Sequence, residues 1–240
     1  LLHNCYDILD SVNALLSPHM FLLVIKGLAL HNINNAKRRA LELFNNKLQQ
    51  HPEFFNECEE KEIYILIPPL LSIIETVNQE DQEVLVQTAL FSFMLLTTTL
   101  AGQTPATFVK ILDFIIKLLK SGNAQGNVLA SVVLCLAELC ACLRAHAIPC
   151  LSSFMPTILK LLKSQRNQDT STLLLISVIT SLYKIIDSLP LFHSPYLTKI
   201  LLEVSILITK WGHDTTDPKL LPIINKLNCF KQKIGTLIPL

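Results

Sequence analysis

The sequence predicts an all-α fold in which a pair of helices recurs about every 43 residues. The segments IIKLLKS at 115–121 and ILKLLKS at 158–164 lie 43 residues apart, and each precedes a polar break and a longer apolar segment. These longer segments share a spacing, with apolar or small side chains at offsets 0, 3, 4, 7, 10, 11 and 14. Such offsets place seven side chains on one helical face.

The stripes defined by this spacing are Val86, Ala89, Leu90, Phe93, Leu96, Thr97 and Leu100; Leu129, Val132, Val133, Leu136, Leu139, Cys140 and Leu143; and Leu175, Val178, Ile179, Leu182, Ile185, Ile186 and Leu189. We call them the second-helix stripes, because each lies in the second helix of a predicted pair.

The repeat length identifies the type of helical array. Two helices in roughly 40–47 residues are typical of HEAT and armadillo repeats, whereas tetratricopeptide repeats are about 34 residues long. A single hairpin cannot bury its own apolar face, so neighbouring hairpins must stack. We therefore expect an all-α, HEAT-type α-solenoid, a right-handed superhelix of antiparallel helix hairpins whose second helices line the concave face.

The predicted array is one continuous domain over residues 1–240 and an excerpt of a longer chain. A short amphipathic helix is expected at 5–17, ahead of the hairpins. About five hairpins follow, at approximately 19–50, 61–101, 106–147, 150–190 and 195–234.

Turn and capping residues mark the first two hairpins. Asn34 or Asn35 is expected to cap the second helix of the first hairpin through its side-chain oxygen. Pro68 and Pro69 lie inside the next first helix, where proline removes a helical hydrogen bond, so a kink is expected. The acidic run 80–83 favours the positive N-terminus of the following helix.

Breaker residues separate the later helices. The sequence GQTP at 102–105 ends the second hairpin, and the loop 121–127 joins helices predicted at 106–120 and 128–146. Pro149 begins the fourth hairpin and Pro190 ends it. The last hairpin has a turn at 212–218.

The charge is unevenly distributed. Half of the residues are hydrophobic, 16% are charged and the net charge is +1, yet residues 53–83 carry −8 and residues 150–240 carry +5. This asymmetry indicates either different partner surfaces or a solvated acidic loop followed by ordinary helix faces. The seven cysteines lie mostly in apolar runs without disulfide spacing, which favours a reducing compartment.

The segment 84–101 contains no charged residue and approaches the length of a transmembrane span. Polar side chains interrupt it, and the equivalent helices contain Glu138, Lys184 and Asp187. The central helix of a solenoid is apolar nearly all round, so we favour a buried helix and expect no membrane.

No catalytic chemistry is visible in the sequence. The Gly122–Gly126 segment lacks the following Lys-Ser/Thr of a phosphate loop, and there is no G-x-S-x-G motif. Cys142 and His146 could share one helix face, but their spacing matches no standard zinc pattern. The paired carboxylates resemble loop or helix-start charges. We expect no enzyme, cofactor, metal site or small-molecule substrate.

Two basic surfaces are candidate binding sites. If the two KLLK segments are equivalent, they form a lysine edge that can follow a phosphate backbone and that Arg166, Lys199 and Lys210 could extend; its members are Lys117, Lys120, Lys160 and Lys163. The alternative is that these lysines only cover apolar surface. A smaller basic face could contact the acidic 53–62 connector or another protein; it consists of Arg38, Arg39 and Lys47.

Three long segments carry a family resemblance. The segments 16–50, 127–163 and 188–204 resemble, in the same order, stretches of the HEAT repeat-containing protein 1 family, the large solenoid of the small-subunit processome. Ala40-Leu41 matches the HEAT second-helix pattern, but Ala36-Lys37 replaces Val-Arg. The substitution at Lys37 weakens the charge ladder that usually joins HEAT repeats.

The resemblance implies a non-catalytic scaffold in ribosome biogenesis, located in the nucleolus. It implies maturation of the small-subunit rRNA, support of rDNA transcription, and association with other processome proteins, pre-rRNA and the U3 snoRNP. The alternatives are a HEAT-repeat adaptor of another class, such as a nuclear transport receptor or phosphatase scaffold, and a polytopic membrane protein. Fold alone does not choose between them.

Overall fold

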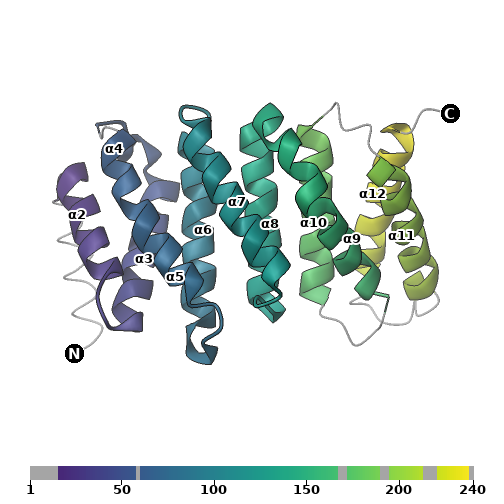
Figure 1. Ribbon diagram of the computed structural model, residues 1–240, viewed down its shortest axis with the longest axis horizontal. Coiled ribbons are helices and arrows are strands. Elements are labelled where there is room, and N and C mark those ends of the chain that lie inside the picture. The colour runs from purple at the N-terminus through teal and green to yellow at the C-terminus, as the bar shows by residue number, and fades with distance from the viewer. Residues whose placement is uncertain (1–15, 58–59, 167–171, 190–194, 213–220, 238–240) are drawn as a thin grey trace. The chain divides into compact units, whose positions relative to one another are not determined.

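The computed structural model describes residues 16–57, 60–166, 172–189, 195–212 and 221–237, and every regular element in these ranges is helical (Figure 1). The predicted helix at 5–17 falls almost wholly outside them. The chain divides into two compact units, Leu1–Leu96 and Thr97–Leu240, which are described separately. The all-α prediction is confirmed for the described residues.

Unit 1 contains two pairs of helical segments. Its elements are α2 (Pro18–Ala29), α3 (Asn34–Gln50), η1 (Pro52–Glu57), α4 (Glu60–Ile63), η2 (Tyr64–Leu66), α5 (Ile67–Glu75), η3 (Glu80–Gln82) and most of α6 (Glu83–Leu100). Helix α2 packs against α3 and against the broken first helix of the next pair, α4–η2–α5. Four phenylalanine rings close the α2–α3–η1 contact at centroid distances of 5.2–6.2 Å; they are Phe21, Phe44, Phe54 and Phe55.

The start of α3 differs from the prediction. Neither Asn34 nor Asn35 caps the helix. The N-cap is Ile33, which makes no side-chain cap, and its carbonyl accepts hydrogen bonds from the backbone N–H of Ala36 and Lys37 at 3.0 and 3.1 Å. The helix begins at Asn34, so both asparagines lie in its first turn and neither is at the N-cap position. Ser17, by contrast, caps α2 through a 3.4 Å hydrogen bond from Met20 N, and Pro18 follows it at the first helical position.

The Pro68–Pro69 segment interrupts its helix. The chain passes from α4 through the 3-10 turn η2 into α5, and the first turn of α5 contains both prolines. Proline tolerates this position because the N–H it lacks would have no intrahelical partner there. The predicted kink is thus an interruption by a 3-10 turn.

Unit 2 contains three hairpins in two layers. They are α7 (Pro105–Ser121) with α8 (Gly126–Leu143), α9 (Leu151–Ser164) with α10 (Thr172–Ser188), and α11 (Pro195–Gly212) with α12 (Leu221–Leu237), and η4 (Arg144–Cys150) joins the first two. The first helices α7, α9 and α11 pack in sequence, and so do the second helices α8, α10 and α12 (Figure 1). Each first helix also packs on its own second helix.

The second-helix stripes form the core. Every member is buried except Leu129, which is partly exposed at the start of α8. The spacing that the three helices share explains this burial, because a residue at each of these positions faces the partner helix or the adjoining hairpin. Thr97, the polar member of the first stripe, is also fully buried.

Helix α8 ends earlier than predicted. The sequence suggested a helix to residue 146, but α8 ends at Leu143 and a 3-10 segment follows. Arg144 has φ 48° and ψ −118°, which turns the chain out of the α-helix. Pro149 lies inside the 3-10 segment, where the lost N–H disfavours a longer α-helix.

Two helical segments are apolar and long enough to cross a membrane by composition and length alone: Glu83–Leu100 and Gly126–Ser164. About half of each apolar stretch, 50% and 56%, is buried within the protein. Core helices of solenoids have the same length and apolar composition, because they contact neighbouring helices on several sides.

Candidate interaction surfaces

The lysine edge lies on the first-helix layer of unit 2. Lys117 and Lys120 project from α7, and Lys160 and Lys163 project from α9, which packs directly against α7. All four side chains are exposed. Lys120 Nζ donates a 3.0 Å hydrogen bond to Ser153 Oγ across the two helices. The repeat therefore brings the two KLLK segments onto neighbouring helices, as their equivalence predicted.

Arg166 occupies a different position from the lysines. Its Nε and Nη2 donate to Glu203 Oε2 at 2.9 and 2.5 Å, which ties the end of α9 to α11. Glu203 is only 13% exposed, so this pair is largely shielded from solvent. The guanidinium is already neutralised by a carboxylate and contributes less than the lysines to attraction of a polyanion.

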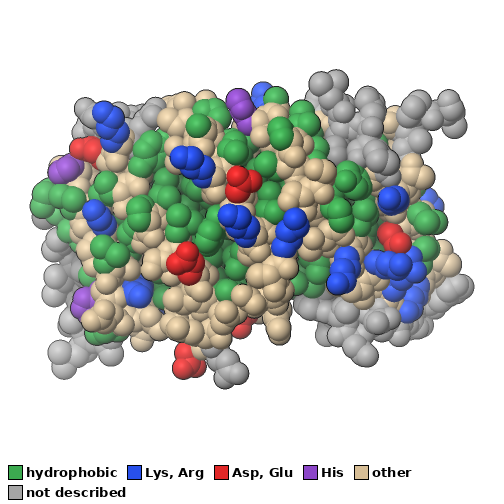
Figure 2. Space-filling view, in the orientation of Figure 1, with side chains coloured by type: hydrophobic (Ala, Val, Ile, Leu, Met, Phe, Trp, Pro, Cys, Tyr) green, Lys and Arg blue, Asp and Glu red, His purple; other side chains and the backbone are tan. Residues whose placement is uncertain are grey.

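The first-helix layer of unit 2 is more basic than the second-helix layer. Helices α7, α9 and α11 contain seven lysines against two carboxylates, a net charge of +5, whereas α8, α10 and α12 contain four lysines against two carboxylates, a net charge of +2. The seven lysines are all exposed, and they include Lys110, which lies outside the two KLLK segments, as well as Lys199 and Lys210. Figure 2 shows Lys and Arg side chains gathered over α7, α9 and α11 with few carboxylates between them.

Polar contacts join equivalent positions of consecutive second helices in unit 2. Lys184 of α10 pairs with Glu138 of α8, and Lys233 of α12 pairs with Asp187 of α10, each across 46 residues of sequence. The equal separations show that these helices stack in register. A charge ladder between repeats is therefore present, at positions other than that of Lys37. These contacts mark the register in which the three hairpins, and with them the lysines of the first-helix layer, are stacked.

The smaller basic face on α3 has intramolecular partners. Arg38 Nε lies 3.5 Å from Glu42 Oε1, and Arg39 Nη1 lies 3.6 Å from Glu42 Oε2. Lys47 Nζ lies 4.1 Å above the ring of Phe54 in η1. The sequence suggested that this face contacts either the 53–62 connector or another protein. Lys47 contacts the connector through Phe54, whereas Arg38 and Arg39 both pair with Glu42 within α3.

Among the connector acids, Glu53 responds to the charge of Lys47. A backbone hydrogen bond, then the His51 side chain and the charge of Lys47, lower the pKa of this fully exposed carboxyl. His51 Nδ1 lies 3.2 Å from Glu53 Oε1. The carboxylate form is favoured, which is typical of a solvated loop acid rather than of a general acid.

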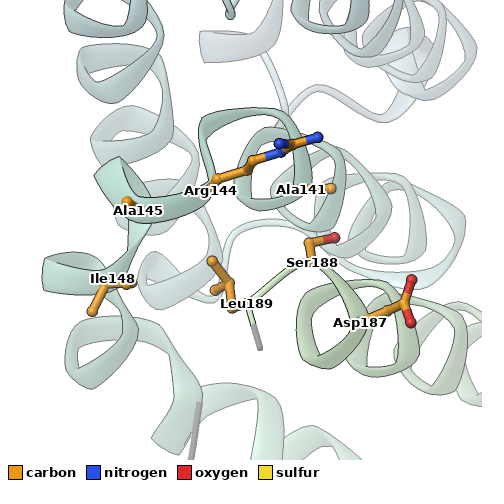
Figure 3. A pocket seen from close by; sticks show the side chains of 7 residues that line it. All are labelled: Ala141, Arg144, Ala145, Ile148, Asp187, Ser188 and Leu189. Atoms are coloured by element: carbon orange, nitrogen blue, oxygen red, sulfur yellow. The ribbon is translucent and has the colours of Figure 1, made fainter. Parts of the chain in front are cut away.

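A pocket of about 560 Å³ lies in unit 2 where α8, η4 and the end of α10 meet (Figure 3). Ala141, Ala145 and Ile148 line it from α8 and η4, and Asp187 and Ser188 line it from α10. Ser188 Oγ donates to the Lys184 carbonyl at 2.6 Å, and Asp187 pairs with Lys233. Both polar groups of the pocket therefore have intramolecular partners.

The cysteines of unit 2 lie in apolar or carboxylate-bearing surroundings. Burial, followed by the Glu138 charge, raises the pKa of the Cys135 and Cys142 thiols. Cys142 Sγ donates to Glu138 Oε1 at 3.7 Å. His146 lies in η4, beyond the end of α8, so Cys142 and His146 do not share one α-helical face. Among the described residues, no group of three or more His, Cys, Asp or Glu side chains could hold a metal ion.

A polar groove in unit 1 was not foreseen. It has a volume of about 370 Å³ and lies between α3 and α6, with Asn45 and Asn46 on one side and Gln87 and Phe91 on the other. The sequence does contain one signal: Asn45 and Thr88, which make a hydrogen bond across the groove, are 43 residues apart, the length of one repeat.

Comparisons with known proteins agree with the repeat architecture. The chain is 38% identical over 208 residues to "HEAT repeat-containing protein 1" of Homo sapiens, which covers 85% of the chain. It is 36% identical over 227 residues to the Danio rerio protein of that name, and 31% identical over 212 residues to the "HEAT repeat-containing protein 1 homolog" of Drosophila melanogaster. No protein-family model matches the sequence.

The chain spans 10% of the length of each of these three relatives. Their names describe HEAT repeats, and together with the helical hairpins they confirm the predicted HEAT-type α-solenoid. The handedness of the superhelix and the continuity of a single array over residues 1–240 stay predictions.

Proposed function

Because this chain belongs to the HEAT repeat-containing protein 1 family and spans 10% of the length of the relatives it matches, we propose that it is part of a non-catalytic scaffold in ribosome biogenesis. In this proposal the whole protein acts in the nucleolus, within the small-subunit processome. It organises other processome proteins around pre-rRNA and the U3 snoRNP during small-subunit rRNA maturation, and it supports rDNA transcription.

The observation that carries the proposal is the family membership over most of the chain, combined with the charge of its first-helix layer. A scaffold for ribonucleoprotein needs extended surface more than a pocket, and stacked repeats supply it because each hairpin adds new surface without a new core. In unit 2 this surface includes the four exposed lysines of the lysine edge on α7 and α9.

The lysine edge supports contact with a phosphate backbone. Lysine ammonium groups on neighbouring helices offer point charges that do not read sequence, and displaced counterions supply most of the driving force. The described surface of α7 and α9 has no exposed aromatic side chain, so we expect contact with backbone rather than stacking on bases. Direct contact between this segment and pre-rRNA is part of the proposal.

The proposal requires no catalysis by this segment. Within the described residues, the pocket hydroxyl and carboxylate have intramolecular partners, and the cysteine thiols described above have raised pKa values.

The test uses the full-length protein with an affinity tag, expressed from its own locus. We expect nucleolar location, co-sedimentation with early pre-ribosomes, and ultraviolet cross-links to pre-rRNA or the U3 RNA. Depletion should lower the amount of small-subunit rRNA relative to large-subunit rRNA.

Two outcomes would contradict the proposal. Stable co-purification with transport cargo or with phosphatase subunits, without pre-ribosomal RNA, would favour a HEAT adaptor of another class. An unchanged ratio of small- to large-subunit rRNA after depletion would remove the maturation role.

A further inference from the structure

The groove between α3 and α6 in unit 1 has the features of a binding site. Its floor contains Asn45, which is 4% exposed, and its rim contains the exposed Asn46 and the half-buried Gln87. Phe91 lies one turn after Gln87 on α6 and is 38% exposed. Three carboxamides and an aromatic ring therefore border one volume of about 370 Å³.

Asn45 fixes the two walls of the groove. Its Nδ2 donates to the Thr88 carbonyl at 3.4 Å, which joins α3 to α6. The same carbonyl also accepts from Ser92 Oγ at 3.0 Å. Asn45 Oδ1, in contrast, is buried and has no hydrogen-bond partner in the protein. This atom is too buried for a ligand in the groove to reach, so Asn45 can act only by holding the two helices together.

The charges of the groove are balanced. Arg39 lines it together with Glu42, and these side chains pair at 3.6 Å. A polyphosphate would meet the Glu42 carboxylate, and a purely apolar helix would leave the carboxamides without partners. The lining favours a ligand that offers neutral donors and acceptors next to apolar side chains.

An extended polypeptide segment has that chemistry. Its backbone presents N–H and C=O groups in alternation, and in a single strand these groups have no partners of their own. Each carboxamide supplies both a donor and an acceptor, so it can pair with both. Backbone pairing with side-chain contacts at alternate residues is an established mode of peptide recognition.

We propose that the α3–α6 groove binds an extended segment of a partner protein, with Asn46 and Gln87 hydrogen-bonding to its main chain and Phe91 packing against an apolar side chain. Asn45 is a positioning residue that holds α6 beside α3. The groove lies within unit 1 and the lysine edge lies within unit 2. Peptide binding by the groove and RNA binding by the lysine edge can therefore be tested independently.

The experiment selects random dodecapeptides displayed on phage against the 240-residue chain, and measures the affinity of enriched, synthesised peptides by fluorescence anisotropy. We expect Asn46→Ala with Gln87→Ala, and separately Phe91→Ala, to weaken binding about tenfold or more, which corresponds to roughly 1.4 kcal/mol. The controls are Gln49→Ala and Val84→Ala, exposed positions on the same two helices that do not line the groove. They should leave the affinity within about twofold.

A second measurement tests main-chain recognition. Methylation of single backbone nitrogens in an enriched peptide removes one donor while keeping the side chain. We expect at least one such change near the centre of the peptide to weaken binding about tenfold, because it removes a main-chain hydrogen bond to Asn46 or Gln87 and adds a methyl group where the two meet. Circular dichroism should show unchanged thermal unfolding of the protein variants.

Three results would overturn the proposal. Selection could yield no enriched peptide. Enriched peptides could bind the Asn46→Ala, Gln87→Ala protein as well as the parent. Backbone methylation at every position could leave the affinity unchanged, which would mean that side chains alone are recognised.

Discussion

Arg144 carries the only positive φ among the described non-glycine residues, 48° with ψ −118°. This region of backbone space is populated mainly by glycine, and a side chain there costs about 1–3 kcal/mol. The residue ends α8 and starts η4, so the strain accompanies the turn between two hairpins. The unusual backbone conformation of Arg144 sets the direction in which the chain leaves α8 and enters η4.

Replacement of Arg144 by glycine should therefore stabilise the protein. Relief of the strain outweighs the backbone entropy of glycine, and we expect the free energy of unfolding to rise by about 1 kcal/mol. Urea denaturation followed by circular dichroism measures the change. The control is Ala145→Gly, an exposed neighbour with ordinary φ, which should lower stability by about 0.5–1 kcal/mol. Lower stability of Arg144→Gly than of the parent would contradict the strain argument.

The second helices are the elements on which the fold depends. Leu182 belongs to the third second-helix stripe and is 0% exposed, whereas Leu173 lies on the same helix, α10, and is 48% exposed. Replacement of Leu182 by alanine removes three buried carbon atoms and leaves a cavity in close-packed surroundings. The same chemical change at Leu173 removes little buried surface.

We expect Leu182→Ala to lower the free energy of unfolding by about 2–5 kcal/mol and Leu173→Ala by less than about 0.5 kcal/mol. Chemical denaturation of the two variants gives both values. Similar effects of the two substitutions would show that α10 does not bury the face that the repeat spacing assigns to it.

The contact between Glu138 and Lys184 reports on the register of α8 and α10. Glu138 is 12% exposed and Lys184 is 41% exposed, so solvent screens part of the attraction. Glu138→Lys and Lys184→Glu should each destabilise the protein, and the double substitution should recover about 0.5–1 kcal/mol. Additive effects of the two changes in a double-mutant cycle would mean that the side chains do not meet.

The sequence predicted the stripes well because a buried helical face leaves a period of 3.6 residues. It predicted the ends of elements less well. The predicted cap at Asn34 or Asn35 was wrong because the Ile33 carbonyl accepts the first hydrogen bonds, and α8 ends three residues earlier than expected, at Leu143. Ends depend on where the next hairpin packs, which periodicity does not encode.

The groove side chains could not be predicted for a related reason. Asn46 and Gln87 each follow the ordinary pattern of polar residues on an exposed helical face. Only the packing of α3 against α6 gives them a common volume. The position of the lysine edge was easier to predict from the sequence, because the two KLLK segments lie 43 residues apart, the length of one repeat. Their partner in binding stays a prediction.

At the scale of the whole molecule, the first-helix layer of unit 2 should dominate binding to RNA. We expect Lys117→Glu with Lys160→Glu to weaken binding of a pre-rRNA spacer transcript and to reduce the slope of log K against log salt by about 1.4–1.8. Filter binding between low and moderate salt measures both quantities.

The matched control is Lys61→Glu with Lys231→Glu, which changes the net charge equally at two exposed lysines outside α7, α9 and α11. It should reduce the affinity much less. If the two double variants lowered the RNA affinity equally, the overall charge of the protein and not the position of the lysine edge would determine binding.

The most direct test of the account concerns the stacking of the hairpins, because the scaffold role depends on it. In a solenoid, stability passes from each hairpin to its neighbours. Leu227 of α12 is 0% exposed, and α12 packs on α10 and α11. Hydrogen exchange followed by mass spectrometry should show that Leu227→Ala removes most protection from α12 and α11, less from α10, and almost none from α7 and α8. An equal loss of protection over these five helices would show that unit 2 is a single cooperative globule without stacked, separable hairpins.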